Sequence, residues 1–250
     1  MNDEKTLQAD DGGLTRTIGG FVAEDYRTAE VFERHGIDFC CGGNVPLDTA
    51  CRQKGIDPAV ILSEIESAKR EPMERSQNFA AWELPFLADY IVAVHHAYIK
   101  DTAGQIVLYA LKVAEVHGSR HPEVKEIASI FEKVAADLAT HLREEEEIFF
   151  PAVKRADAAR KAGERPERQD IDAIRGDLAR LRREHEEVGD AIHAIRRLAG
   201  DFAIPDDACN TYRVTYQKLK EFEDDLHKHV HLENNIIFLK VERELIPSAA

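Results

Sequence analysis

Histidine and glutamate recur in this chain at a spacing that suits metal binding. The stretches 141–145 and 229–233 each place a glutamate four residues after a histidine, giving the pairs His141/Glu145 and His229/Glu233. A helix turns once in about 3.6 residues, so both members of such a pair lie on one face. Imidazole and carboxylate groups on a shared face can coordinate a cation together. The residue types therefore favour a metal site with nitrogen and oxygen ligands.

Four predicted helices carry these residues on their apolar stripes. The stripes have the three- and four-residue spacing of bundle helices and also include Val92, Ile99, Val134, Leu138, Ile148, Leu178, Leu181, Leu226 and Ile236. Helices predicted over about 85–117 and 170–199 contribute single histidines, His96 and His185. A buried carboxylate without compensation costs several kcal/mol or more. The compensation that we expect here is a metal cation.

The heights of the histidines along the helices support one shared centre. His96 lies 21 residues before His117, at the end of the first predicted helix, and His141 lies 20 residues after His121, near the start of the second. Antiparallel neighbours that rise equally from one turn bring such side chains level. His117 itself lies about 31 Å from His96 along a continuous helix, too far to join the same centre.

Six ligands suit two ions better than one. They exceed the needs of a tetrahedral zinc, whereas two ions could each take two histidines, bridged by Glu145 and Glu233. Mixed nitrogen and oxygen ligation indicates iron or manganese, and a water-derived bridge would leave each ion room for a small ligand. One histidine on an apolar stripe is ordinarily a hydrogen-bonded core residue, but four on four stripes favour metal. Within the run Glu144–Glu147 only Glu145 holds a stripe position, and we expect the other three to be solvated.

Composition narrows the classes of partner and compartment. The net charge of -14 argues against nucleic acid or an anionic membrane as the main partner, because both attract basic surfaces. No apolar run approaches the ~20 residues of a membrane span, and the N-terminus has no signal-peptide core, which predicts a cytoplasmic protein. Four cysteines, with Cys40 and Cys41 adjacent, indicate thiol chemistry or metal binding rather than a secreted disulfide framework.

The expected organisation is all-α. We expect a flexible arm at 1–16, a small helical domain at 17–72, a linker at 73–80 and an up-down-up-down four-helix bundle at 81–246. The small domain contains a Cys-Cys-Gly-Gly loop that we expect to be exposed.

Several local features of the bundle are also predicted. Pro151 should kink or end the second helix, and residues 156–169 read as a surface connection. The fourth helix should begin between residues 206 and 212. His95, His227 and His231 lie off the stripes and should face elsewhere.

In these motifs and in those below, the chain resembles a known family, the iron-sulfur cluster repair di-iron proteins, which have a hemerythrin-like C-terminal domain. Asp38-Phe39-Cys40-Cys41-Gly42-Gly43 is similar to that family's Asp-Tyr-Cys-Cys-Gly-Gly signature. The segments 141–151, 183–186 and 229–235 resemble its helix motifs. Leu239 departs from the proline that the family usually has after the fourth-helix motif.

The resemblance implies particular roles. It implies two iron ions per chain, with a carboxylate and an oxo or hydroxo bridge, held by His96, His141, Glu145, His185, His229 and Glu233. It also implies repair of iron-sulfur clusters damaged by nitric oxide or peroxide. In the mechanism that we hypothesise, the centre donates labile iron, and Cys40 and Cys41 accept iron or a nitrosyl group.

The same residues are also compatible with two other functions. The chain could be a hemerythrin-like binding module that carries or senses dioxygen or nitric oxide, or it could reduce nitric oxide at the centre. A structural zinc bundle fits least. The sequence leaves open whether the chain is a monomer or a homodimer, and which damaged proteins are its partners.

Overall fold

The computed structural model describes residues 13–70 and 78–246, which fall into two compact units, Met1–Ala80 and Ala81–Ala250. Within the described residues there is no β-strand, only an isolated bridge between Thr17 and Pro46. Most of the arm expected at 1–16 and of the linker expected at 73–80 lies outside the described residues, and the domain boundaries stay predictions.

The smaller unit is built from short helices. They are α1 (Ile18–Glu24), the 3₁₀ turn η1 (Tyr26–Thr28), α2 (Ala29–Arg34), α3 (Leu47–Lys54), α4 (Pro58–Ala68) and the 3₁₀ turn η3 (Phe79–Ala81), whose last residue is the first residue of the larger unit. Side-chain caps fix two of the helix starts, since Thr17 accepts from the Gly20 amide and Asp57 from the Ala59 amide. Gly36 follows α2 with a φ of 62°, a left-handed conformation that glycine adopts without strain.

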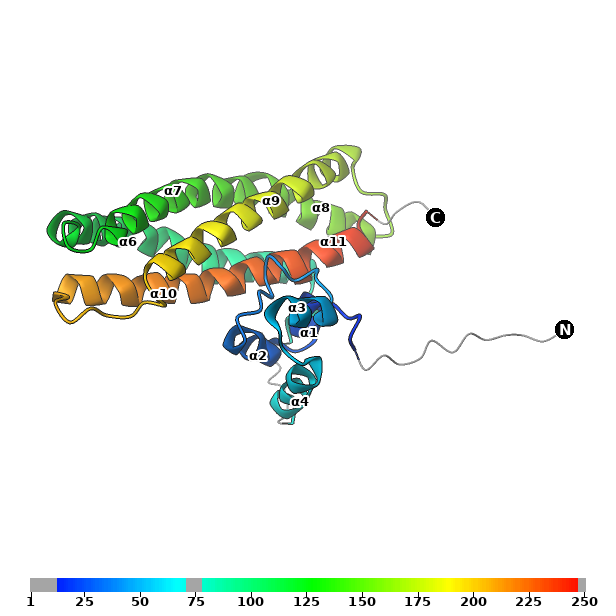
Figure 1. Cartoon of the computed structure of the whole chain (residues 1–250). Coiled ribbons are helices and arrows are strands. Elements are labelled where there is room, and N and C mark those ends of the chain that lie inside the picture. The colour runs from blue at the N-terminus through cyan, green and yellow to red at the C-terminus, as the bar shows by residue number, and fades with distance from the viewer. Residues whose placement is uncertain (1–12, 71–77, 247–250) are drawn as a thin grey trace. The chain divides into compact units, whose positions relative to one another are not determined.

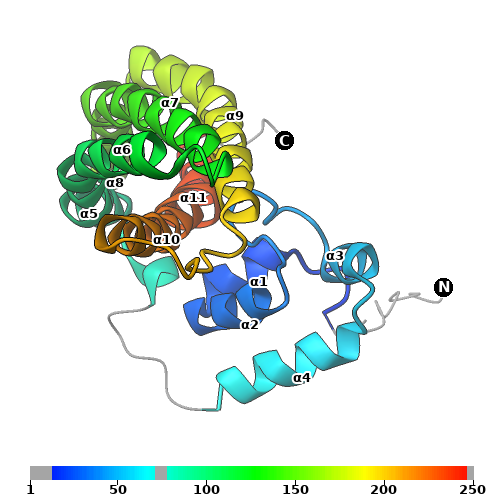
Figure 2. The same cartoon turned by 60° about the vertical axis from the view of Figure 1, so that its left-hand side comes forward.

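The larger unit is a bundle of four antiparallel rods (Figures 1 and 2). The rods are α5 (Leu84–Tyr90), η4 (Ile91–His96) and α6 (Ala97–His117); α7 (Glu123–Glu144), η5 (Glu145–Phe149) and α8 (Phe150–Lys161); α9 (Arg168–Leu198); and α10 (Asn210–His231), η6 (Leu232–Ile237) and α11 (Phe238–Glu244). Figure 2 shows α6, α7, α9 and α10 arranged around a common axis. The predicted all-α fold, with an up-down-up-down bundle, is confirmed.

Three of the rods contain a π-helical segment, namely η4, η5 and η6. A π turn takes one residue more than an α turn and so rotates the buried face relative to a continuous α-helix. Phe149 is therefore fully buried, whereas Ile148, which the regular spacing places on the buried stripe, is 48% exposed. Ile91 is likewise more buried than Val92. The predicted stripe was wrong at Ile148 for this reason.

The second rod also extends further than its sequence indicated. Pro151 lies in the first turn of α8, where a missing amide hydrogen is tolerated, so it does not end the rod. Residues 156–161 are helical, and Ala156 and Asp157 are buried. The expectation of a surface connection at 156–169 was therefore wrong for its first six residues. The fourth rod begins at Asn210, within the predicted range.

Among the described residues, none of the helices combines the length and the apolar character that crossing a bilayer requires.

Candidate metal centre

The π segments place three acidic or imidazole side chains at one depth in the bundle. His96 ends η4, Glu145 begins η5, and Glu233 is the second residue of η6. Inserted π turns are frequent at functional sites because they re-aim a side chain within an otherwise regular helix. His141, His185 and His229 come from the regular helices α7, α9 and α10. All four rods therefore contribute to the centre.

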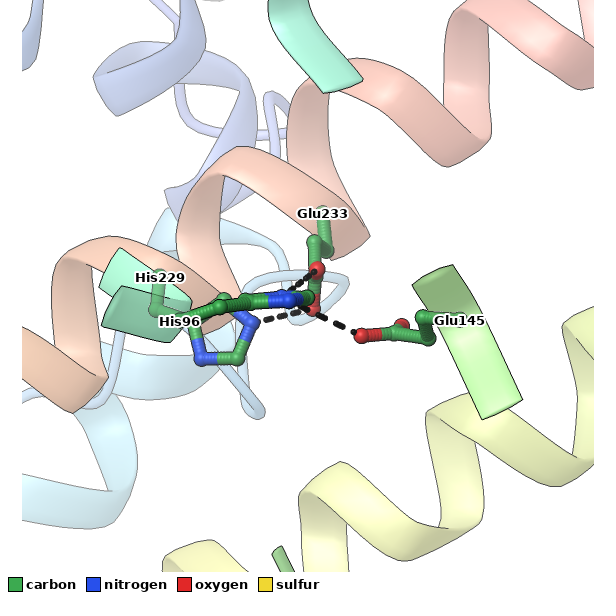
Figure 3. A group of neighbouring side chains, drawn as sticks. All are labelled: His96, Glu145, His229 and Glu233. Atoms are coloured by element: carbon green, nitrogen blue, oxygen red, sulfur yellow. Dashed lines mark ion pairs between the residues drawn. The ribbon is translucent and has the colours of Figure 1, made fainter. Parts of the chain in front are cut away.

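One half of the centre consists of His96, His229 and two glutamates (Figure 3). The Nε2 atom of His96 lies 3.4 Å from Glu145 Oε2 and 3.6 Å from Glu233 Oε1, and His229 Nε2 lies 3.0 Å from Glu233 Oε2. Glu145 and Glu233 face each other across this half, and all four residues are buried. Their ligand atoms all lie within 4.8 Å of one another.

The other half pairs His141 and His185 with the same two glutamates. His141 Nε2 lies 3.4 Å from Glu145 Oε2, and His185 Nε2 lies 3.1 Å from Glu233 Oε2. The two imidazole nitrogens are themselves only 3.0 Å apart. Because each half uses both carboxylates, the structure brings together all six predicted residues with the glutamates in the shared position.

Two of these histidines are oriented by oxygen atoms on their outer sides. His141 Nδ1 donates to Glu184 Oε2 at 2.8 Å, and His185 Nδ1 donates to Asn234 Oδ1 at 2.9 Å. Arg180 donates in turn to Glu184, which fixes that carboxylate. A neutral imidazole that donates from Nδ1 carries a lone pair on Nε2, the form that binds metal.

A third histidine is oriented in the same way. His96 Nδ1 lies 2.8 Å from Glu146 Oε1, and Lys100 forms an ion pair with the same carboxylate. The expectation that Glu146 is simply solvated was therefore wrong, because its carboxylate turns toward His96. His229 instead stacks against His95, with the rings 10° from parallel.

Sequence reasoning missed these orienting residues, although a signal for them exists. Glu146 follows Glu145, Glu184 precedes His185 and Asn234 follows Glu233, so each is the chain neighbour of a predicted ligand. Each reaches a histidine on a neighbouring rod. A polar residue directly beside a buried ligand is thus a candidate to orient a ligand from elsewhere in the fold.

The remaining histidines lie outside both groups. His95 Nδ1 lies 3.0 Å from Asp225 Oδ1, and Nδ1 of the buried His231 lies 3.2 Å from the side-chain Nδ2 atom of Asn235. His117 lies at the far end of α6, with its Nε2 3.2 Å from Cys209 Sγ.

The two buried carboxylates of the centre favour the binding of positive charge, as protons or as a cation. Burial alone would lower the pKa of His96, but Glu145 and Glu233 outweigh it and raise that pKa to about 10. Burial and the charge of Glu233 raise the pKa of Glu145. Burial lowers the pKa of His229 to about 4, which keeps its imidazole neutral. Protons held by such a cluster are displaced when a metal cation binds.

The donor set fits a metal. The lone pairs of His141 and His185 Nε2 would repel each other at 3.0 Å unless a proton or cation lies between them. Two cis ligands at about 2.1 Å from one ion are themselves about 3.0 Å apart. Among the described residues, His96 Nε2 and both oxygens of Glu145 and Glu233 are buried without a hydrogen-bond partner. Such groups are costly unless something ligates them.

A cleft connects one half of the centre with the surface. It has a volume of about 960 Å³, runs between α7 and α9, and is lined in part by His141, His185, Glu184, Arg180 and Ile148. The histidines of the other half, His96 and His229, do not line it. A small ligand entering by this cleft would meet the His141/His185 half first.

Comparison with known proteins gives two matches to family models. Residues 14–69 match a family described as a domain of unknown function, DUF542, and residues 87–241 match the hemerythrin HHE cation binding domain. The two matched segments fall in the two compact units.

Curated proteins match over most of the chain. An iron-sulfur cluster repair protein ScdA of Staphylococcus epidermidis is 30% identical over 222 residues, 88% of this chain and 95% of the relative. A probable iron-sulfur cluster repair protein of Haemophilus influenzae is 31% identical, covering 86% of this chain and 91% of the relative. The iron-sulfur cluster repair protein YtfE of Yersinia pestis is 27% identical, covering 91% and 97%.

Proposed function

The chain belongs to the family of iron-sulfur cluster repair proteins with a hemerythrin-like domain, and on that premise we propose that it repairs clusters by donating iron from a di-iron centre in its bundle. One ion would be held by His96 and His229 and the other by His141 and His185, with two shared carboxylates. Those carboxylates are Glu145 and Glu233.

The observation that carries this proposal is the sharing of both carboxylates by two histidine pairs. Histidine and carboxylate ligands in a bundle core suit iron. Two histidines per ion with shared carboxylates hold iron less tightly than a closed thiolate cage would, which suits a centre whose iron must leave. Bound iron would supply both the exchangeable cargo and coordination positions for a small ligand.

The chain's own residues would control orientation and access. Glu146, Glu184 and Asn234 hold three imidazoles with Nε2 facing inward. The cleft between α7 and α9 gives small molecules a route to His141 and His185. It supports nitric oxide or dioxygen as ligands of that half.

We place the acceptor of iron, or of a nitrosyl group, at Cys40 and Cys41. Thiolates are soft ligands suited to receiving iron. The damage repaired would be that caused by nitric oxide or peroxide, the compartment would be the cytoplasm, and the partners would be damaged iron-sulfur proteins.

The test is the iron content of a double variant. Glu145→Leu/Glu233→Leu should lose binding of two irons per chain, measured by metal analysis and by the near-ultraviolet absorption of ferric pairs. Glu147→Leu is the matched control, because Glu147 is exposed on the same π segment. Unchanged iron content in the double variant would end the assignment.

Cluster reactivation then separates repair from gas binding. The wild-type protein should reactivate a nitric oxide-damaged iron-sulfur enzyme, and Cys40→Ser/Cys41→Ser should reactivate it more slowly. Full reactivation by that variant would remove the cysteines from the mechanism. Gas binding without any reactivation by the wild-type protein would favour a carrier or sensor.

A further inference from the structure

The loop between α2 and α3 holds three side chains that could ligate a metal outside the bundle. Asp38, Cys40 and Cys41 bring one carboxylate oxygen and two sulfur atoms within 4.8 Å of one another. All three belong to the smaller unit, so the cluster is independent of the bundle centre. Cys40 is buried and Cys41 is partly exposed, so the expectation of an exposed loop was wrong for Cys40.

The Asp38 carboxylate organises this loop. Its Oδ1 atom accepts from the amides of Cys40 at 2.9 Å and Cys41 at 3.1 Å, and its Oδ2 atom accepts from the Gly42 amide at 3.0 Å. A Cβ atom at Gly42 would lie only 3.0 Å from the Asp38 carbonyl oxygen, so glycine lets the chain wrap closely around Asp38. The neighbours Ile37 and Phe39 are buried and anchor the loop in the core of this unit.

The distances within the cluster match a shared cation. Two thiolates at about 2.3 Å from a tetrahedral ion are about 3.8 Å apart, and the sulfurs of Cys40 and Cys41 lie 3.9 Å apart. A disulfide would instead require them to approach to about 2.05 Å. An oxygen ligand of the same ion would lie about 3.5 Å from each sulfur, and Asp38 Oδ1 lies 3.1 Å from Cys40 Sγ.

We propose that Asp38, Cys40 and Cys41 form a three-ligand site for a thiophilic divalent cation, with Asp38 as a ligand as well as the organiser of the loop. Binding exchanges two thiol protons, released to solvent, for one cation, and it involves no change of oxidation state. The cation takes the position of the hydrogen atom that the Cys40 thiol donates to Asp38. The partial exposure of Cys41 leaves a fourth position open for a ligand from outside.

The site deepens the proposed function but does not depend on it. That the natural cation is iron, received from the di-iron centre, rests on the proposed function. That the loop binds a cation rests on its own geometry. The iron content of the bundle tests the proposed function, and the binding of a probe metal by the loop tests the loop site. Either proposal can therefore be wrong while the other holds.

Cobalt titration of the full-length, reduced protein, first freed of iron so that no other metal competes for the loop, tests the site under anaerobic conditions. Thiolate ligands give Co²⁺ an intense charge-transfer absorption that histidine and carboxylate ligands do not give, so the bundle centre stays silent in this signal. We expect one such Co²⁺ per chain. Cys40→Ser and Cys41→Ser should each diminish the signal, and Cys209→Ser, which removes an exposed thiol in the larger unit, should leave it unchanged.

Asp38→Asn tests the new ligand. Asparagine keeps an oxygen that can accept from the loop amides but removes the charge, so Co²⁺ affinity should fall at least the roughly tenfold that even outer changes to a metal site cause. Far-ultraviolet circular dichroism checks that the helices persist. Wild-type affinity in this variant, or absence of the charge-transfer signal in the wild-type protein, would overturn the proposal.

Thiol protection gives a second readout that needs no variant. Bound Co²⁺ should slow alkylation of Cys40 and Cys41, located by mass spectrometry, and leave the alkylation rates of Cys51 and Cys209 unchanged. Equal rates at Cys40 and Cys41 with and without Co²⁺ would also overturn the proposal.

Discussion

The Nε2 atoms of His141 and His185 lie 3.0 Å apart, and each ring donates its Nδ1 proton to an oxygen atom on its outer side. Two imidazoles fixed in this way direct their lone pairs at each other. The arrangement is favourable only when positive charge, from a proton or a metal cation, lies between the two rings, so we expect a bound metal to stabilise the fold.

Removal of metal should therefore destabilise the bundle. A ligand that binds only the folded state at 100 times its Kd stabilises that state by about 2.7 kcal/mol. We expect a strong chelator to lower the Tm and added Fe²⁺ to restore it, as measured by circular dichroism. A Tm that is indifferent to chelation, with iron shown to be gone, would contradict this.

Replacing Glu146 should weaken iron binding without removing a ligand. Its carboxylate orients His96, and the loss of such an outer partner typically costs about 10–100-fold in metal affinity. We expect Glu146→Ala to release iron to a competing chelator at correspondingly lower chelator concentration. Glu147→Ala is the control on the same segment, and equal behaviour of the two variants would show that Glu146 has no orienting role.

The π turn in the second rod predicts opposite effects for two adjacent residues. Phe149 is fully buried, so Phe149→Ala should cost about 3–5 kcal/mol of unfolding free energy through lost burial and cavity formation. Ile148 is about half exposed, so Ile148→Ala should cost well under 1 kcal/mol. Urea unfolding of the chelated protein measures both. A larger cost at Ile148 would indicate a continuous α-helix.

A buried carboxylate on α10 depends on an arginine of α9. Glu223 is fully buried and lies 2.7 Å from Arg196, whose side chain is about a third exposed. Arg196→Met should cost about 2 kcal/mol, below the 3–5 kcal/mol of a fully buried pair because water partly screens the arginine. Arg196→Met/Glu223→Met should recover most of that loss in urea unfolding. A double variant as unstable as the single one would contradict this explanation.

The turn at the far end of the bundle should make stability depend on pH. His121 Nε2 lies 2.9 Å from Asp207 and its Nδ1 lies 3.1 Å from Glu123, a geometry in which both nitrogens can donate only when the ring is protonated. These carboxylates, Asp207 foremost, raise the pKa of His121, and the nearby Arg120 and the His117 ring also face this turn.

A raised pKa in the folded state fixes the sign of the effect. The stabilisation by His121 is complete below its unfolded pKa of about 6.5 and is lost as the pH rises through the higher folded pKa. The Tm of the wild-type protein should therefore decline across this range more steeply than that of His121→Gln. Parallel pH profiles for the two proteins would exclude the contribution.

The sequence by itself determined the four rods and the depth at which their ionisable residues meet, because helical spacing is local and six charged or imidazole groups on apolar stripes require compensation. His96 and His141 could be placed at one level simply by counting residues from the turn between the first two helices. The same local rule placed Ile148 in the core, where the fold instead buries Phe149.

Only the tertiary structure decided the register and the support of the site. The π turns at Glu145 and Glu233 depart from regular helical geometry, and the apolar periodicity of the sequence does not predict them. The pairing of Glu146 with His96 joins residues 50 positions apart. Such contacts depend on which rods are neighbours, which periodicity within one helix cannot specify.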